Sequence, residues 1–167
     1  MSPGCQQSMA RRALPAPISE EVQVSLRGRI YRWWGGDNFE FGDHQRLHYI
    51  LVQGIKSPAP GSKHYHAAKQ ATIDLTRSRR VLINVKDRDM MMREIAEVLV
   101  PVEMGKPDNE SWSDGPLDGS DVDRFDLGLR LIELGWAEYN GLEFEKVAAY
   151  QTAEELARQQ KLGIWSE

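Results

Sequence analysis

The chain has 167 residues, of which 41% are hydrophobic and 28% charged, and its net charge is −4. This length fits one globular domain and excludes a large multidomain enzyme. The single cysteine, Cys5, excludes an internal disulfide framework and a cysteine-rich zinc site. No apolar run approaches the roughly 18 residues of a membrane helix, so no membrane span is predicted.

The charges are distributed unevenly along the chain. Residues 1–102 contain 15 Lys and Arg against 10 Asp and Glu, whereas residues 103–167 contain 6 against 15. The overall negative charge provides no general attraction to nucleic acid. The first part of the chain is therefore the part that we expect to face phosphates.

Residues 1–19 are predicted to form a flexible tail, because they contain three prolines and no apolar period. The tail lacks the apolar segment of a secretory signal. Gly4-Cys5 followed by Gln6-Gln7 is nevertheless typical of the junction of a bacterial lipoprotein signal whose apolar part would lie upstream. That interpretation favours the cell envelope or secretion, and an incidental cysteine in a disordered terminus is the alternative. The compartment is left unassigned.

Residues 20–167 are predicted to form one domain that begins with three strands. Residues 22–33 alternate apolar and polar side chains, as a half-buried strand does. A Gly-Gly-Asp-Asn turn at 35–38 leads to a short second strand at 39–41. A third strand, largely apolar, is expected over 47–55.

Beyond the third strand, the pattern predicts a helix, two strands, an acidic loop and two helices, with Gly163 ending the last helix. The expected ranges are 64–78, 81–85, 95–102, about 103–120, 121–139 and 142–161. Five short strands interrupted by a helix after the third predict an α+β fold with a five-stranded OB-type β-barrel. Such a barrel offers one face to oligonucleotides or oligosaccharides.

The C-terminal third carries two sequence motifs that point to a family. One helix contains Leu131-Ile132 followed by Gly135-Trp136-Ala137, and the chain closes with Lys161-Leu162-Gly163-Ile164-Trp165. These segments resemble the end of staphylococcal nuclease and its relatives, which carry a leu-val-x-x-gly-leu-ala pattern and then lys-x-gly/asn-ile/leu-trp. The resemblance covers roughly residues 21–167. It implies an OB barrel with one helix after the third strand and two C-terminal helices, which is the order predicted above.

The same resemblance implies a degenerate active site. Active relatives hydrolyse DNA and RNA with one calcium ion, which is bound by the second Asp of an asp-gly-asp-thr turn and by the Asp of an asp-thr-pro-glu segment. Asp37 matches the first of these ligands. Lys56 and Ala59 stand where the second ligand and the Glu that activates water are expected, and Leu51 replaces a phosphate-binding Arg. A later tyr-gly-arg motif keeps only its Arg, as Arg93.

The remaining residues do not make a complete calcium-dependent catalyst. Calcium takes about six to eight oxygen ligands, so Asp37 is at most a weak remnant of a metal site, and the Lys56 ammonium would repel the ion. We expect no cofactor, or calcium if an active site persists. Arg93 is the one catalytic remnant. The resemblance favours an enzyme, whereas the missing carboxylates and arginine argue against one.

The candidate ligand-binding residues are Asp37, Lys56, Arg93 and Trp34. Lysine can bind phosphate as a point charge, so Lys56 could take the place of the ion. The alternative is a salt bridge between Asp37 and Lys56 that plugs the old site. Adjacent residues of a strand point to opposite faces, so at most one of Trp33 and Trp34 is a core residue, and an exposed tryptophan could stack on bases.

Two further groups of residues leave alternatives open. The four histidines at positions 44, 48, 64 and 66 could bind zinc if the third strand and the first helix converge; exposed or hydrogen-bonded histidines are the alternative. Met90, Met91 and Met92 lie at a predicted hairpin tip, where methionines make an adaptable contact surface.

Three functions follow from the sequence. The first is a catalytically impaired domain that binds single-stranded nucleic acid, or another phosphate-bearing ligand, on the barrel face. The second is a protein-interaction or envelope module, which the acidic loop and the net negative charge favour. The third is an active phosphodiesterase or nuclease with a rewired site.

Overall fold

The structure is a computed structural model that describes residues 24–102 and 123–166. The predicted tail at 1–19 and the predicted acidic loop at 103–120 lie outside the described residues. The elements, in chain order, are β1 (Val24–Trp33), β2 (Asn38–Gly42), β3 (Leu47–Val52), β4 (Ile55–Lys56), α1 (Tyr65–Thr76), β5 (Val81–Arg88), β6 (Glu94–Pro101), β7 (Arg124–Asp126), α2 (Leu127–Glu133), β8 (Glu138–Tyr139), α3 (Val147–Gln159) and the 3₁₀ turn η1 (Gly163–Trp165).

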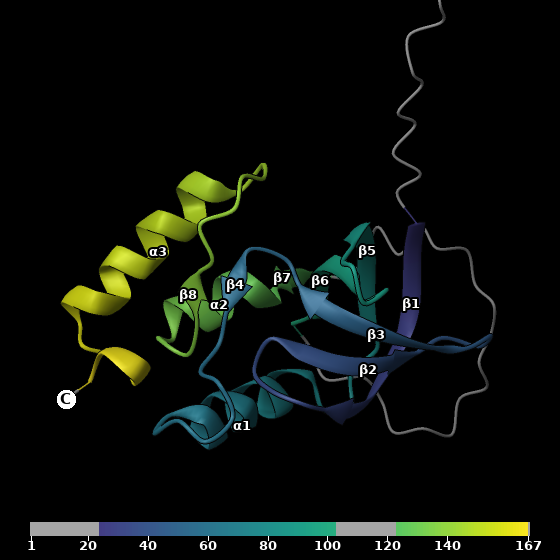
Figure 1. Cartoon of the computed structure of the whole chain (residues 1–167), viewed down its shortest axis with the longest axis horizontal. Coiled ribbons are helices and arrows are strands. Elements are labelled where there is room, and N and C mark those ends of the chain that lie inside the picture. Colours follow the sequence, from purple (N-terminus) through teal and green to yellow (C-terminus); the bar gives the residue numbers. More distant parts are fainter. Residues whose placement is uncertain (1–23, 103–122, 167) are drawn as a thin grey trace, which may run out of the picture.

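Five strands close into a barrel. The strand order is β3-β2-β1-β5-β6, with β7 on the outer edge of β6, and β3 pairs in addition with β6. This closing pair is parallel, whereas the other pairs are antiparallel. Figure 1 shows α2 and α3 together beside the barrel and α1 below β2. The predicted α+β fold, with one helix after the third barrel strand and two C-terminal helices, is confirmed.

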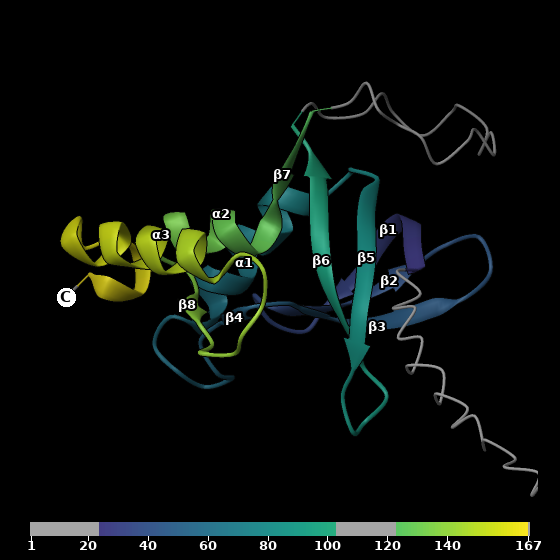
Figure 2. The same cartoon turned by 90° about the horizontal axis from the view of Figure 1, so that it is seen from above.

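The barrel interior is filled by alternate residues of the strands, as the period-2 pattern predicts. Phe39, Phe41 and Ile50 are fully buried, whereas Glu40 and Tyr49, which alternate with them on β2 and β3, are only partly buried. Helix α2 adds Leu127 and Leu131 to the same hydrophobic cluster. The core is therefore shared between the barrel and the helix that lies against it (Figure 2).

A polar network fixes α3 to the rest of the fold. The Asp126 carboxylate caps α2 by accepting the Leu129 N–H at 3.2 Å, and it accepts the Tyr150 hydroxyl at 2.9 Å and the Lys146 ammonium at 3.0 Å. Lys146 also donates to Glu97 of β6. Burial and the neighbouring carboxylate raise the pKa of the Tyr150 phenol, so that it remains a donor. One carboxylate thus connects β7, α2 and α3.

The third strand is shorter than predicted. It ends at Val52, and the chain turns at Gln53-Gly54 before Ile55-Lys56 form β4, which pairs with β8. Gly54 has a φ of +82°, in the left-handed region that favours glycine. Apolar residues on both sides of the turn are buried, which explains why the sequence looks like one continuous strand.

The helix predicted over 121–139 is also wrong in length. Within the described part of that range, residues 124–126 form β7 and α2 has only seven residues. The helix ends at Gly135, which has a φ of +79°, and the Trp136 N–H donates to the Leu131 carbonyl at 2.8 Å. The predicted helix is too long because its apolar repeat includes Phe125, which lies on β7 and not in a helix.

The last helix differs from the prediction at both ends. It begins at Val147 rather than at residue 142. The first left-handed residue after the helix is Lys161, with a φ of +52°, and the Leu162 N–H closes the helix by donating to the Ala157 carbonyl at 3.1 Å. Gly163 is also left-handed but lies two residues further on. It begins η1.

The glycines of the two C-terminal motifs meet in space. The Ile164 N–H donates to the Gly135 carbonyl at 2.8 Å, which ties η1 to the end of α2. A Cβ on Gly135 would collide with the Leu162 carbonyl, and one on Gly163 would collide with Gly135. The close approach explains why both positions require glycine.

Gly135→Ala should destabilise the fold more than Gly141→Ala, its matched control. Both glycines have a φ near +80°, but a Cβ on Gly141 would meet nothing within 4 Å. We expect a loss of about 1–2 kcal/mol for the control from the left-handed backbone, and roughly 1–3 kcal/mol more for Gly135→Ala from overpacking. Urea unfolding measures both, and equal losses would contradict the close approach.

Candidate functional site

Asp37 lies in the turn between β1 and β2 and is half-buried. Its carboxylate accepts the Ser57 N–H at 3.1 Å, and its backbone carbonyl accepts the Val52 N–H at 2.8 Å. The turn is therefore tied both to the end of β3 and to the segment that follows β4. This segment contains Lys56 and Ala59, so the structure brings Asp37 next to the positions where the resemblance places the lost carboxylates.

Lys56 is exposed on β4, and its cross-strand neighbour is Glu138 of β8. Both Asp37 and Lys56 belong to the described residues, and no ion pair joins them. The expected salt bridge that would plug the old site is thus not formed. Asp37 instead uses its carboxylate on the backbone of Ser57.

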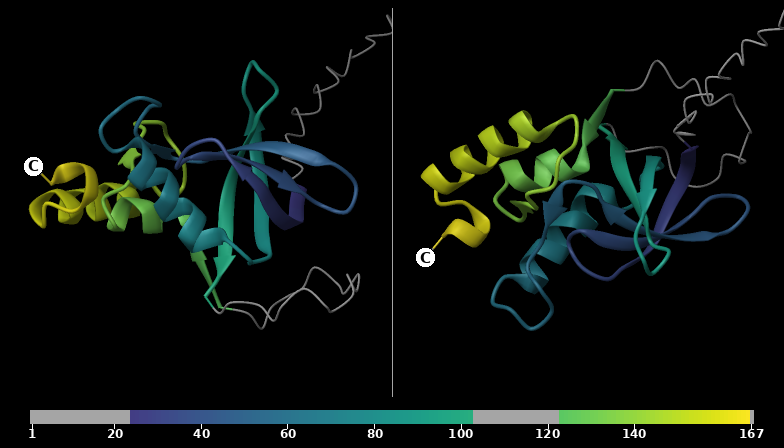
Figure 3. Two further views of the ribbon diagram at one scale, coloured as in Figure 1. Left: turned by 90° about the horizontal axis from the view of Figure 1, so that it is seen from below. Right: turned by 45° about the horizontal axis from the view of Figure 1, so that its top comes forward.

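Arg93 follows the tip of the β5–β6 hairpin, which projects beyond the rest of the barrel (Figure 3). The preceding residue, Met92, has a φ of +64° and stands where the family motif has glycine, which supports the alignment of Arg93. The guanidinium lies 5.9 Å from the centre of the Tyr49 ring, and its Nε donates to Asp89 at 2.6 Å. The hydrogen bond that Arg93 donates to the Asp89 carboxylate raises the pKa of Arg93 above its ordinary value.

A chain of contacts leads from Arg93 back to the turn that contains Asp37. The Tyr49 hydroxyl accepts the side-chain N–H of Asn38 at 3.0 Å, and Asn38 directly follows Asp37. Tyr49 and Asn38 come from neighbouring strands, β3 and β2. The structure therefore places Arg93 and Asp37 at the two ends of one polar path, although neither touches the other.

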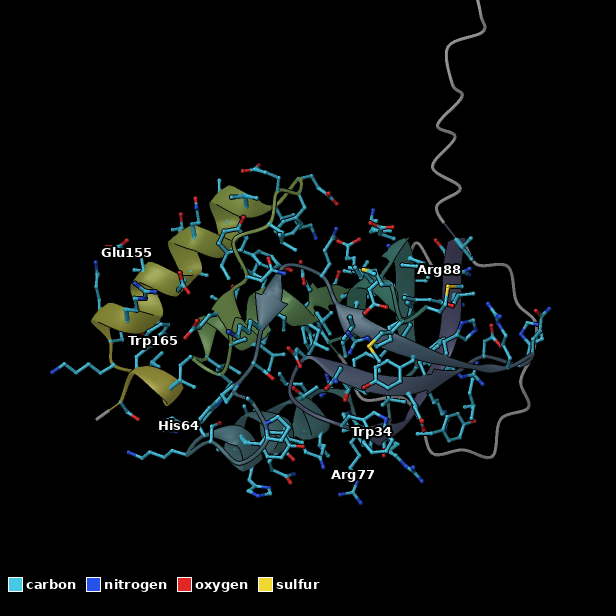
Figure 4. All side chains as sticks on the ribbon, viewed as in Figure 1. Trp34, His64, Arg77, Arg88, Glu155 and Trp165 are labelled. Atoms are coloured by element: carbon cyan, nitrogen blue, oxygen red, sulfur yellow. The ribbon has the colours of Figure 1, made fainter. Side chains whose placement is uncertain are left out.

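The two tryptophans behave as strand alternation predicts. The Trp33 indole packs against the core and donates to the Thr76 hydroxyl at 3.0 Å. The Trp34 side chain is 42% exposed, and the Arg32 guanidinium lies 5.2 Å from the centre of its ring. Figure 4 shows Trp34 below β2, on the side of α1.

The residues at the predicted metal position do not fit calcium. One oxygen of the Asp37 carboxylate is engaged by the Ser57 N–H, and the neighbouring side chain is the cationic Lys56. Within residues 24–102 and 123–166, no group of three His, Cys, Asp or Glu side chains is arranged so that it could hold a metal ion. The same observation applies to the zinc site considered for the four histidines.

A buried charged network lies beneath Arg93, and no sequence pattern indicated it. His48 of β3 is only 5% exposed. Its Nδ1 lies 3.0 Å from Glu94 Oε1, and its Nε2 lies 3.1 Å from Asp43 Oδ2. Each ring nitrogen of His48 is thus within hydrogen-bond distance of a carboxylate oxygen. Arg46 and Arg88 approach the same Glu94 oxygen at 3.6 and 3.8 Å.

The signal for this network was weak, because its members are far apart in sequence. His48 and Glu94 are brought together by the pairing of β3 with β6, in which Ile50 faces Glu94. Burial acts to raise the pKa of Asp43, but the backbone N–H groups of Arg46 and Gln45, together with His48, outweigh it and lower the pKa. The network anchors Glu94, the residue next to Arg93.

The closed five-stranded barrel and the three helices in the described part of the chain define an α+β domain of OB type. A model of the staphylococcal nuclease homologue family matches residues 49–167. The chain therefore belongs to the staphylococcal nuclease homologue family, as the C-terminal motifs indicated. None of the curated proteins compared with the chain matches it. No helix in the described part of the chain is long and apolar enough to cross a membrane.

Asp43→Asn should lower the free energy of unfolding near neutral pH and make it depend less on pH in the acid range. Because the folded-state pKa of Asp43 lies below its unfolded value, the ionised form contributes stability above about pH 4. That contribution is lost as the pH falls through the lowered folded-state pKa. We expect a loss of roughly 1–3 kcal/mol at pH 6, shrinking toward pH 2. Urea unfolding across this range checks it, and a difference independent of pH would contradict the role of the charge.

Proposed function

We propose that this staphylococcal-nuclease-like domain is catalytically impaired and binds single-stranded nucleic acid, or another phosphate-bearing ligand, on the barrel face. The observation that carries this proposal is the position of Arg93 beside Tyr49. Its side chain is 33% exposed, and its ion pair with Asp89 fixes the guanidinium at the surface beside the ring of Tyr49. A guanidinium beside an aromatic ring supplies one contact to phosphate and one surface for a base.

The loss of catalysis follows from which groups are missing. Efficient phosphodiester hydrolysis needs a group that activates water and several charges that stabilise the transition state. Ala59 has no proton acceptor in its side chain, and Leu51 has no charge. Removing one such group commonly lowers the rate by about a hundredfold, and losses in one site are not additive.

The binding groups are spread along the barrel rather than gathered in one pocket. Arg93 and Tyr49 lie toward the β5–β6 hairpin, Lys56 lies on β4, and Trp34 lies at the end of β1. This spacing suits an extended strand better than a compact ligand, since a nucleic acid chain can contact separate phosphates and bases.

A second candidate function, protein interaction, is favoured by the hairpin tip. Met90, Met91 and Met92 are all strongly exposed. Flexible methionine side chains make adaptable contact surfaces. A protein partner bound through this tip would cover Arg93 as well. Nucleic-acid binding and protein binding would therefore use the same surface and would differ in how strongly the affinity depends on salt.

Arg93→Ala should weaken the binding of a single-stranded oligonucleotide and reduce its dependence on salt. Loss of one phosphate contact lowers the slope of log K against log salt by about one. Lys161→Gly is the matched control, because it removes one positive charge at the far end of α3 from a position whose φ of +52° suits glycine. Fluorescence anisotropy at several salt concentrations measures both variants. Equal slopes for the two would show that Arg93 contacts no phosphate.

The wild-type protein should not cleave DNA or RNA oligonucleotides in calcium or in a chelator. A fluorophore–quencher assay with Arg93→Ala as the control measures this. Calcium-dependent cleavage that the substitution abolishes would instead establish the rewired phosphodiesterase.

A further inference from the structure

A cavity of about 370 Å³ lies between parts of the chain that are distant in sequence. Its wall is formed by the segment from Lys56 to His64, which joins β4 to α1, by Glu138 of β8 and by Ile164 of η1. Figure 4 shows His64 on the side of α1 toward the C-terminal turn. Small-molecule sites occupy about 300–1,000 Å³, so this cavity has room for a small organic ligand.

The charged side chains around this cavity are not used by the fold. In the described residues, Lys56, Lys63 and Glu138 make no side-chain hydrogen bond or ion pair, although Lys56 and Glu138 are cross-strand neighbours. His64 does not cap α1 with its side chain, and its ring lies 6.3 Å from that of Trp136. These groups are available to a ligand.

The wall that carries these groups is nevertheless well fixed. The Ser62 hydroxyl donates to the Ala59 carbonyl at 2.7 Å, and the Ser57 N–H donates to Asp37 at 3.1 Å. The Ile164 N–H is bonded to Gly135 at 2.8 Å. A cavity with a fixed wall binds without the entropy loss of ordering a loop.

The charge pattern selects the class of ligand. Lys56 and Lys63 place two ammonium groups at the cavity, and lysine ammonium groups bind phosphate oxygens as point charges. The Glu138 carboxylate accepts hydrogen bonds only, so it suits hydroxyl groups and repels a bare anion. Pro58 and Ile164 supply an apolar surface for a carbon skeleton.

We propose that this cavity binds a phosphate monoester of a small polyhydroxylated molecule, such as a sugar phosphate. Lys56 and Lys63 hold the phosphate, and Glu138 accepts hydrogen bonds from the hydroxyl groups. This site shares Lys56 with the barrel face but does not depend on nucleic acid binding there.

The test is calorimetric titration of the full chain with ribose 5-phosphate, ribose and inorganic phosphate at low ionic strength. We expect saturable binding of ribose 5-phosphate, tighter than that of either other probe. Lys63→Ala should weaken it by about tenfold or more, the loss of one charged hydrogen bond. Lys69→Ala is the matched control, since Lys69 belongs to α1 but does not line the cavity.

Glu138→Gln separates recognition of the ester from attraction of any anion. Removing the carboxylate should tighten the binding of inorganic phosphate and reduce the preference for ribose 5-phosphate. The proposal is overturned if ribose 5-phosphate does not bind, if Lys63→Ala binds it as well as wild type does, or if wild type binds inorganic phosphate equally tightly.

Two further titrations keep this site distinct from the barrel face. Arg93→Ala should bind ribose 5-phosphate normally even if it loses the oligonucleotide. The affinities of a 5′-phosphorylated oligonucleotide and of its 5′-hydroxyl form are then compared. The difference shows whether the cavity also binds the phosphate monoester at the end of a nucleic acid. A gain from the 5′-phosphate that Lys63→Ala removes supports the cavity, whereas a gain that Lys63→Ala leaves intact would count against it.

Discussion

The barrel closes where a buried histidine is held between two carboxylates. The β3–β6 ladder that completes the barrel is only three residue pairs long. At its beginning, His48 bridges Glu94 of β6 and Asp43 of the β2–β3 turn, at 3.0 and 3.1 Å. Buried charges are costly unless they are paired and hydrogen-bonded, so any other register of β6 would leave these groups unpaired. The network therefore selects one closure of the barrel.

This closure also positions Arg93, the residue that the family resemblance aligns with a phosphate-binding arginine. Glu94 is fixed from within the barrel, and the next side chain along, Arg93, turns outward beside Tyr49 and is held by Asp89. At the other end, Asp37 is fixed by backbone bonds to Val52 and Ser57. The backbone around Asp37 and the position of Arg93 are thus fixed, whereas Lys56 and Ala59 stand where the family resemblance places a calcium ligand and the group that activates water. This combination is the basis on which we propose binding rather than catalysis.

The sequence predicts those features that depend on neighbouring residues. Alternation predicted the first two barrel strands, an apolar run predicted the third, and short motifs contain the two glycines that meet in the C-terminal region. The predicted helix over 121–139 failed because a local period does not reveal that β6 captures residues 124–126 as a strand. For the same reason, the sequence did not predict the contacts of His48 with Glu94 and Asp43, or the cavity lined by Lys56 and Lys63. Each joins segments far apart in sequence, and each exists only once the barrel has closed and η1 has docked.

The two proposed sites differ in the charge that they match. A phosphodiester carries one negative charge, whereas a phosphate monoester carries about −1.5 to −2 at neutral pH. Arg93 presents a single guanidinium on an open surface, which suits successive diesters of a strand. Lys56 and Lys63 present two ammonium groups at one cavity, which suits a single dianion, and Glu138 beside them disfavours anions that lack hydroxyl groups. Lys56, which stands where the family resemblance places a calcium-binding carboxylate, would on this proposal supply half of the positive charge that holds the phosphate.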